Sequence, residues 1–359
     1  MNDSYALFGV MASQWRKSVQ LLFFTVTFGL SGVVANGEEG NGLGPFRTQA
    51  IELKAGWNAV YLEVDPLEND PNLLFEETPI EIVTSYFRPV STQQFVENPS
   101  EVLKNPEGWN VWYRPGRADE LLTDIYEIQA HTSYLIYTKE DYNWMPEGVP
   151  FYGTTQWHPN AYSLVGFPID SAQAPTVENF FAGVSAHAEL KVYKLVSGNW
   201  NLITDAAGTL REAGVAYWTY AKGDSEFSGP LQIDFSTESF GGLIYREDSN
   251  AQEIVFKNVT PYPQEITVSL VAGKTGLIPL SLGILKINGE EQPIDRVSLP
   301  FGDSIEIKAL EAGESFLLDL EVRQMEVNVP LMASSLAVST DAGVRIEIPL
   351  VSIRQDLLE

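Results

Sequence analysis

A phrase that occurs twice constrains this chain more than any other feature. The first copy runs from Asn58 to Pro66 and the second from Asn160 to Pro168, and both read N-A-x-x-L-x-x-x-P. Each copy is followed by a second shared pattern, Y-x-x-Y-x-K-x-D, which begins at Tyr134 and again at Tyr217. Matched opening and closing patterns in the same order indicate a tandem duplication.

Composition favours a β-rich chain with ordinary packed cores. The 359 residues predict two or three domains, and 44% hydrophobic residues is enough to build them. Eleven per cent aromatic residues, 28 Gly and 21 Pro indicate many turns rather than a helical bundle. The chain has no cysteine, which excludes disulfides, thiolate metal sites and cysteine catalysis.

The charge balance limits the classes of partner. The formal net charge is −26, so a nucleic-acid backbone would be repelled and no basic stripe exists to attract one. The same balance argues against binding to anionic membranes. Solubility outside the cell explains the charge better than a specific cation-binding role.

The N-terminus resembles a secretory signal. Arg16 and Lys17 precede an apolar run that ends at a small-residue cleavage pattern before Ala35, so we predict a signal peptide over residues 1–35. An uncleaved anchor is less favoured because the run is short and contains Thr, Ser and Gly. The pattern fits a start at Met1 or at Met11. Residues 36–50 are rich in Gly and Glu and predict a flexible linker.

Alternation and turn residues then divide the remainder of the chain. The first unit is expected over residues 51–153 and the second over 154–237, each with four strands and one short helix. The helices are expected near 71–77 and 177–182. A polar segment at 91–107 has no counterpart in the second unit and predicts a loop insertion.

The residues of the two units carry a family resemblance. Gly56-Trp57-Asn58, Ser197-Gly198-Asn199-Trp200 and Val215–Tyr220 follow the order of the GWN-type β repeat of bacterial and archaeal secreted and surface proteins. The second copy has Trp157-His158-Pro159-Asn160 in place of the opening G-W-N and so departs from the pattern. The resemblance covers residues 51 to about 235. It implies exported, non-catalytic β domains and transfers no catalytic residue.

The last third of the chain has a different texture. Aromatic residues become fewer from residue 238, and aliphatic residues alternate in six or seven segments separated by turn signals such as Asn288-Gly289. This spacing predicts an immunoglobulin-like β-sandwich over residues 238–355. The expected fold class is therefore all-β, with one or two short helices, two tandem units and a C-terminal sandwich.

Candidate chemistry is sparse. The three histidines lack the spacing of a metal site or a hydrolase motif, so we predict no enzyme, and a glycoside hydrolase is the weakest alternative. An acidic loop follows the first strand of the first unit and suggests calcium as the only cofactor, although a solvated turn is the simpler interpretation. Its carboxylates are Glu63, Asp65, Glu68 and Asp70.

Aromatic residues crowd into the duplicated region. Those that recur in both copies, Tyr134 with Tyr217 and Tyr137 with Tyr220, are expected to be structural. The unmatched Trp112, Tyr142 and Trp144 are the candidates for an exposed glycan-binding surface, because aromatic faces stack on sugar rings. Core packing is the favoured alternative for the group as a whole.

These patterns predict an exported, non-catalytic structural or interaction protein of the bacterial envelope or matrix, located in the periplasm, at the cell surface or outside. Its partners would be a protein or a polysaccharide of the cell surface, and the alternative function is carbohydrate binding. Specific function is expected where the two copies differ, at residues 88–107 and in the acidic loop after Leu62.

Overall fold

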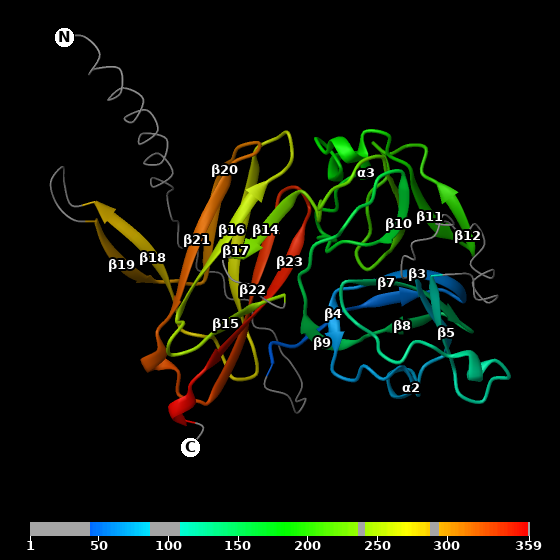
Figure 1. Cartoon of the computed structure of the whole chain (residues 1–359), viewed down its shortest axis with the longest axis horizontal. Helices are drawn as coiled ribbons and strands as arrows, with labels where there is room; N and C mark the ends of the chain where they lie inside the picture. The colour runs from blue at the N-terminus through cyan, green and yellow to red at the C-terminus, as the bar shows by residue number, and fades with distance from the viewer. Residues whose placement is uncertain (1–43, 87–107, 236–240, 288–293, 358–359) are drawn as a thin grey trace, which may run out of the picture.

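The structure is a computed structural model of the chain, and it describes residues 44–86, 108–235, 241–287 and 294–357. These residues confirm the all-β fold class, because antiparallel sheets dominate and the two α-helices are single turns. The predicted signal peptide and the segment at 88–107 lie outside the described residues. In Figure 1 the two units lie on one side, the second above the first, and the sandwich lies beside both.

The first unit is a four-stranded sheet crossed by one helical turn. Its order is β3-β7-β5-β6. The strands are β3 (Gly56–Leu62), β5 (Ile80–Tyr86), β6 (Trp109–Tyr113) and β7 (Thr132–Thr138), with the helix α2 (Pro71–Leu74) and the 3-10 turn η2 (Glu120–Leu122) in the connections. Two small sheets flank it: β1 (Arg47–Thr48), β9 (Glu147–Pro150) and β4 (Val64–Pro66), and β2 (Ile51–Leu53) with β8 (Tyr142–Trp144).

The second unit repeats the same topology. Its order is β10-β13-β11-β12, so in both units the last strand in sequence lies between the first and the second. The strands are β10 (Ala161–Val165), β11 (Val192–Val196), β12 (Asn199–Leu202) and β13 (Tyr217–Ala221), with α3 (Val177–Phe180) and the 3-10 turn η3 (Ser185–His187) between β10 and β11. Both helices fall where the sequence predicts them.

The shared closing tyrosines occupy equivalent positions. The backbone N–H of Gln129 donates to the hydroxyl of Tyr134 at 2.9 Å, and the N–H of Glu212 donates to that of Tyr217 at 3.2 Å. Both donors lie five residues before the tyrosine. Both side chains are buried, so the prediction that these tyrosines are structural is confirmed.

The shared opening phrase, in contrast, does not occupy equivalent positions. Tyr137 and Tyr220 are matched residues of the two closing strands, and they pair with Trp57 and Tyr162, respectively. Position 57 of the first unit therefore corresponds to position 162 of the second. Aligning the two copies of the phrase would instead match position 57 with position 159, three residues earlier. Because strand side chains alternate between faces, an odd offset turns them over. Leu62 is buried within its own unit, whereas Leu164 lies between the units.

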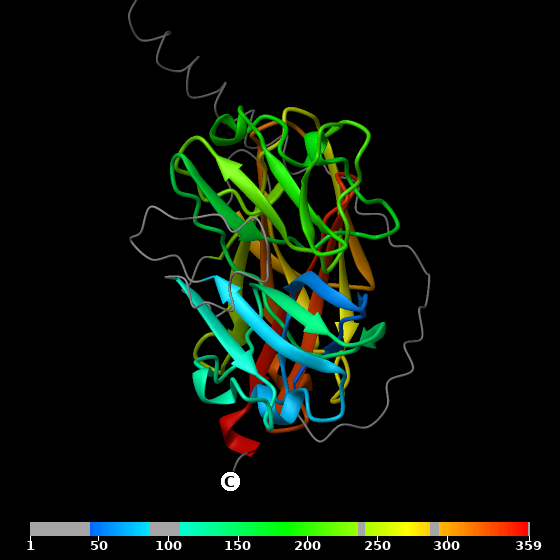
Figure 2. The same ribbon diagram turned by 90° about the vertical axis from the view of Figure 1, so that its right-hand side faces the viewer.

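The two sheets pack face to face across an aromatic interface. It buries Trp109 of the first unit with Trp200 and Trp218 of the second, and Tyr86 lies 5.4 Å from Trp218 between ring centroids. Strand pairing makes Trp109 and Trp200 equivalent, so matched positions of the two units lie in one interface, as in a two-fold dimer. Figure 2 shows the second unit stacked on the first.

One contact of this interface is unusually close. A Cβ added to Gly166 would lie 2.1 Å from the Cβ of Tyr61. By the register of the strands these two residues occupy equivalent positions. A large side chain in one unit is therefore accommodated by a missing side chain in the other.

The C-terminal part is a sandwich of two five-stranded sheets, and this prediction is confirmed. One sheet has the order β14-β16-β21-β18-β19 and the other β15-β23-β22-β17-β20. Their bounds are β14 (Leu231–Phe235), β15 (Leu243–Tyr245), β16 (Ala251–Asn258), β17 (Gln264–Ala272), β18 (Leu280–Ile287), β19 (Ile294–Pro300), β20 (Ser304–Leu310), β21 (Ser315–Val322), β22 (Leu331–Thr340) and β23 (Arg345–Ile353). The 3-10 turns η4 (Gln324–Glu326) and η5 (Gln355–Leu357) complete the described elements.

Two predicted boundaries are wrong. Strand β14 pairs with β16, so the sandwich begins by Leu231 rather than at residue 238. Residues 47–50 are not a flexible linker, because β1 pairs with β9 and Arg47 forms ion pairs with Glu63 at 2.7 Å and Glu347 at 3.5 Å. Tertiary pairing of this kind leaves little trace in local composition.

We predict that Gly166→Ala destabilises the protein by roughly 1–3 kcal/mol, because the new methyl group overlaps Tyr61 in a packed interface. The measurement is urea unfolding. The control is Gly223→Ala, whose added Cβ would meet Ala186 at 3.3 Å and should cost less. Equal costs for the two variants would contradict the close packing at Gly166.

Candidate functional site

The predicted glycan-binding aromatics do not form a surface. Trp112 is 1% exposed and Trp144 is 3% exposed, and their ring centroids lie 5.2 and 5.4 Å from that of Phe75. Tyr142 is half-buried against the same cluster. The prediction of exposure is therefore wrong for Trp112 and Trp144. A single helical turn covers this face of the sheet, and large rings fill the volume beneath it.

The predicted calcium ligands do not form a site either. Glu63 is half-buried and forms an ion pair with Arg47, and desolvation raises the pKa of its carboxyl group. Asp65 accepts the N–H of Ala130, and Glu68 accepts the N–H of Asp70. Asp70 itself caps the N-terminus of α2. Among the described residues no group of three or more acidic or histidine side chains could hold a metal ion.

The buried charge of the first unit is fully paired. The Glu81 carboxylate forms ion pairs with Lys139 at 2.7 Å, Arg117 at 3.0 Å and Arg114 at 3.3 Å. Burial alone would raise the pKa of Glu81, but hydrogen bonds from Lys139 and Arg117 outweigh it and hold this pKa below its usual range. This cluster is structural, because each charge has a partner.

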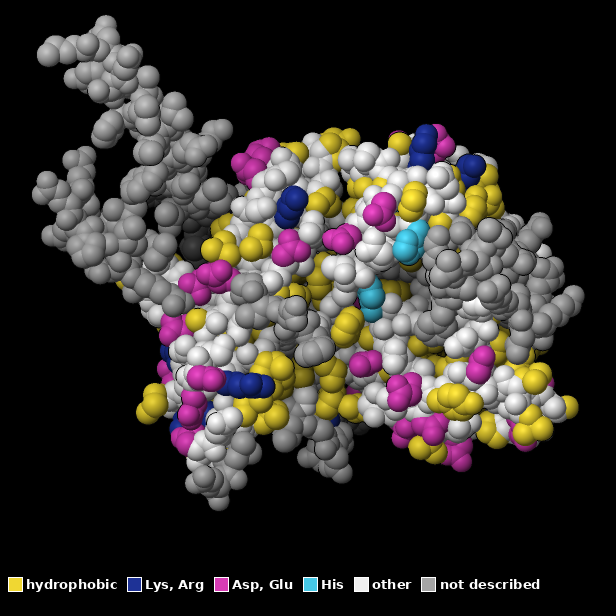
Figure 3. Space-filling model, viewed as in Figure 1, with side chains coloured by type: hydrophobic (Ala, Val, Ile, Leu, Met, Phe, Trp, Pro, Cys, Tyr) yellow, Lys and Arg dark blue, Asp and Glu magenta, His cyan; other side chains and the backbone are white. Residues whose placement is uncertain are grey.

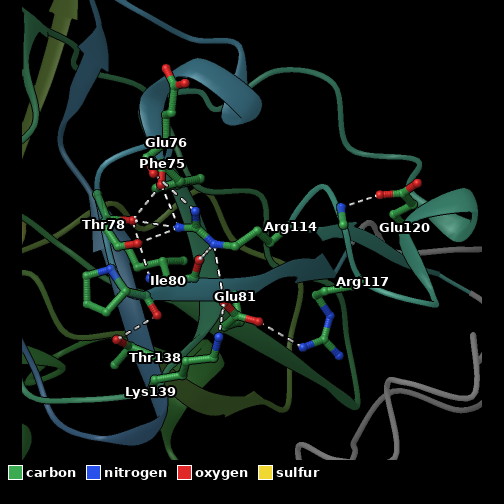
Figure 4. Close-up of polar contacts among 12 residues, drawn as sticks. Phe75, Glu76, Thr78, Ile80, Glu81, Arg114, Arg117, Glu120, Thr138 and Lys139 are labelled. Atoms are coloured by element: carbon green, nitrogen blue, oxygen red, sulfur yellow. Dashed lines mark hydrogen bonds and ion pairs between the residues drawn. The ribbon is translucent and has the colours of Figure 1, made fainter.

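Arg114 also fills a corner between α2 and β5. Its guanidinium donates hydrogen bonds to the main-chain oxygens of four residues, as Figure 4 shows. The acceptors are Phe75, Glu76, Thr78 and Ile80. The side chain thereby satisfies carbonyl groups that the end of a one-turn helix leaves unpaired.

The second unit has a buried charge of the opposite kind. Arg211 is 1% exposed, and none of the described residues accepts a hydrogen bond from its side chain. Four aromatic rings surround the guanidinium, with centroids 4.6 to 5.4 Å from its central carbon. They belong to Phe167, Phe180, Phe181 and Tyr217. Burial lowers the pKa of Arg211 to about 10, so the group remains charged at neutral pH.

The first unit shows what this position requires for folding. The N–H of Arg211 donates to Pro175 and the N–H of Ile128 donates to Asn69, one residue before the helix cap in each unit. Arg211 thus corresponds to Ile128, which is buried in the core of the first unit. An apolar residue serves the fold there. Counting back from the matched tyrosines would have revealed this substitution in the sequence.

His187 is a second buried group. It is 4% exposed, and both ring nitrogens are enclosed, with the main chain of Tyr220 as the hydrogen-bonding group that acts on the ring. Its ring lies 4.4 Å from Trp157 and 4.7 Å from Phe181 between centroids. Burial lowers the pKa of His187 to about 4, so the imidazole is neutral at neutral pH.

His187 lines a cavity at the C-terminal end of α3. The cavity has a volume of about 500 Å³ and is open on one side. Phe181, Ala182, Ala188 and Leu190 form much of its apolar wall, and Glu178 and Asp205 add two carboxylates. This cavity, with Arg211 behind the ring of Phe181, is the candidate functional site of the second unit.

The first unit carries a different exposed feature. Five large apolar side chains at its outer end are 50 to 91% exposed, namely Leu67, Leu73, Leu121, Leu122 and Tyr126. Figure 3 shows hydrophobic and acidic side chains intermingled over this end of the molecule. We call these five residues the outer apolar surface. The two segments that carry it are joined by the hydrogen bond from Ile128 to Asn69.

Comparisons with known proteins identify partial similarities. No family model and no curated protein matches the chain. The YadV chaperone structure is similar over 35% of this chain and 52% of its own, at 13% identity and a TM-score of 0.22. A FixG-related protein from Vibrio parahaemolyticus is similar over 35% and 97%, at 14% identity and a TM-score of 0.21.

A third similar structure is the CsuC-CsuE chaperone-tip adhesion subunit pre-assembly complex from Acinetobacter baumannii, over 34% of this chain and 57% of that one, at 14% identity and a TM-score of 0.21. The chain thus spans about half the length of the YadV and CsuC-CsuE chains that it matches. Within the described residues, no helix has the length and apolar character needed to cross a bilayer. Similarity of this extent leaves the function to be argued from the chain's own residues.

We predict that Arg211→Met raises the free energy of unfolding by about 1–4 kcal/mol. The cost of burying an unpaired charge exceeds what aromatic contacts return, and methionine keeps a long side chain among the rings. Urea unfolding at neutral pH measures the change, with Ile128→Met as the matched control. A loss of stability in Arg211→Met would mean that the rings stabilise the cation by more than its burial costs.

We predict that His187 contributes to acid destabilisation. Its folded-state pKa of about 4 lies below the unfolded value of about 6.5. Between these values the unfolded chain binds the extra proton, so stability falls as the pH falls. Unfolding of His187→Leu should therefore depend less on pH from 6.5 to 4 than that of the wild type. The same slope in His187→Leu as in the wild type would refute the assignment.

Proposed function

We propose that this chain is an exported, non-catalytic interaction protein of the bacterial envelope or extracellular matrix. The outer apolar surface of the first unit is the observation that carries this proposal. The signal-like N-terminal sequence supports export. The proposed partner is another protein, which binds this surface.

The outer apolar surface is more than a scatter of single leucines. Its residues lie on α2, on η2 and on the adjoining loops, outside the buried cluster of the first unit. Leu121 and Leu122 are consecutive and both exposed, although neither is needed to complete the core. Exposed apolar groups that gather in this way mark protein interaction sites.

Charge defines the complementary partner. Exposed carboxylates lie among the apolar residues, including Glu68, Glu76, Glu120 and Glu127. The arginines of the same segments are engaged, because Arg114 and Arg117 pair with Glu81. The outward charge of this end is therefore negative. A partner with an apolar centre and a basic rim would match it, and the net charge of −26 would speed the encounter.

The carbohydrate alternative has less support. Trp112 and Trp144 are buried, and Tyr126 is the one aromatic member of the outer apolar surface. A glycan platform needs flat rings that are accessible to sugar faces. Leucines supply no such face.

Site-specific photo-crosslinking in the cells that produce the protein tests the proposal. A crosslinker at Leu121 or at Tyr126 should yield the same discrete, protease-sensitive adduct. The adduct at Tyr126 should disappear in the Leu73→Asp, Leu121→Asp double variant. Both leucines are exposed, so this variant should unfold within about 0.5 kcal/mol per site of the wild type.

Met325 provides the matched control. It is 90% exposed but lies on η4 of the sandwich, so a crosslinker there should give no such adduct. An identical adduct at Met325, or one that survives the double variant, would overturn the proposal. A protease-resistant adduct that a glycosidase removes would favour the carbohydrate alternative instead.

A further inference from the structure

The same corner of the fold is filled in one unit and hollow in the other. In the first unit the corner lies between the end of α2, the segment that leads to β5, and the residue that follows β6. Arg114 is that residue, and its guanidinium binds the surrounding main-chain oxygens. In the second unit the cavity lies between the end of α3, the segment that leads to β11, and the residues that follow β12.

Strand register shows which residue replaces Arg114. Thr84 pairs with Val111 in the first unit, and Tyr193 pairs with Leu202 in the second. On its other side, Thr84 pairs with Leu135 and Tyr193 pairs with Trp218. Leu135 and Trp218 are equivalent because each follows the matched closing tyrosine. Position 111 thus corresponds to 202, and position 114 corresponds to Asp205. The second unit has a carboxylate where the first has a guanidinium.

The helix ends correspond as well. Asp70 and Thr176 are the N-caps of α2 and α3, and Phe75 and Phe181 are their C-caps. The carbonyl group of Phe75 accepts a hydrogen bond from Arg114, whereas Phe181 lines the cavity. The first unit therefore shows what kind of group this corner of the fold holds.

The cavity offers acceptors and lacks cations. Glu178 and Asp205 supply carboxylates, and no lysine or arginine is among the lining residues. His187 contributes its ring to the wall of the same space, and both of its ring nitrogens are enclosed. Two carboxylates suit a planar cationic donor with several N–H groups.

We propose that the cavity at the end of α3 binds the guanidinium group of a ligand, in the place that Arg114 fills within the first unit. The ligand brings the side chain that the second unit lacks. Its guanidinium donates to the carboxylates of Glu178 and Asp205, and its aliphatic part packs on Ala182, Ala188 and Leu190. This site is separate from the outer apolar surface, and the inference does not depend on the proposed function.

Arg211 opposes this binding. Its guanidinium lies 5.4 Å from the centroid of Phe181, whose ring also lines the cavity. A like charge at this depth disfavours a second cation. Arg211→Met should therefore bind the ligand several-fold more tightly than the wild type does.

Calorimetric titration with N-acetyl-arginine amide tests the proposal. We expect saturable binding at one site, and binding of the neutral isostere N-acetyl-citrulline amide to be at least tenfold weaker. Glu178→Gln and Asp205→Asn should each weaken binding severalfold. Asp248→Asn removes the same charge from an exposed turn of the sandwich and should leave binding unchanged.

A second variant fills the corner from within the chain. Asp205→Arg should abolish binding of N-acetyl-arginine amide and raise the melting temperature, as expected if the new side chain takes the role of Arg114. Three results would overturn the proposal. The first is a lack of saturable binding, and the second is equal binding of N-acetyl-citrulline amide or of N-acetyl-lysine amide. The third is binding that neither Glu178→Gln nor Asp205→Asn weakens.

Two further probes identify the source of the guanidinium. Agmatine represents a free small molecule, and a blocked Gly-Arg-Gly peptide represents an arginine of a protein partner. Tighter binding of agmatine supports a small-molecule ligand, and tighter binding of the peptide supports a protein side chain. Both results support the site, because both depend on Asp205.

Discussion

The contact between the two four-stranded sheets is the constraint on which the rest of the structure depends. Trp109, Trp200 and Trp218 are buried there rather than within either unit alone. Each sheet consequently has a face that is apolar but needs the other unit to cover it. Tyr61 fits against Gly166 at the tightest point, so each unit is shaped to receive the other and neither copy is free to vary independently.

Because the interface residues are needed for folding, we expect specific function at the positions where the two units differ. The first unit fills one corner with Arg114 and closes its core with Ile128. The second unit leaves that corner hollow and buries Arg211, which has no hydrogen-bond partner among the described residues. An uncompensated buried charge costs stability. Its presence beside a cavity distinguishes the second unit, whereas exposed leucines distinguish the outer end of the first.

Sequence patterns predicted the secondary-structure elements more accurately than they predicted which side chains are exposed. The all-β class, both helical turns and the C-terminal sandwich follow from alternation and turn residues. Trp112 and Trp144 were expected at the surface because they lack counterparts, but a residue without a counterpart can equally fill a cavity peculiar to one unit. The repeated N-A-x-x-L phrase also misleads. Its two copies lie at positions of the two sheets that differ by three residues, and only the pairing with the neighbouring strand shows this difference.

The sequence by itself determined the periodicities, and hence the strands, the helical turns, the negative charge and the structural tyrosines at 134 and 217. Those properties depend on residues close together in the chain. Tertiary structure alone decided that Arg47 pairs with both Glu63 and Glu347, that Gly166 receives Tyr61, and that Asp205 corresponds to Arg114. These relations join residues far apart in sequence, and they exist only once strand register places the residues together.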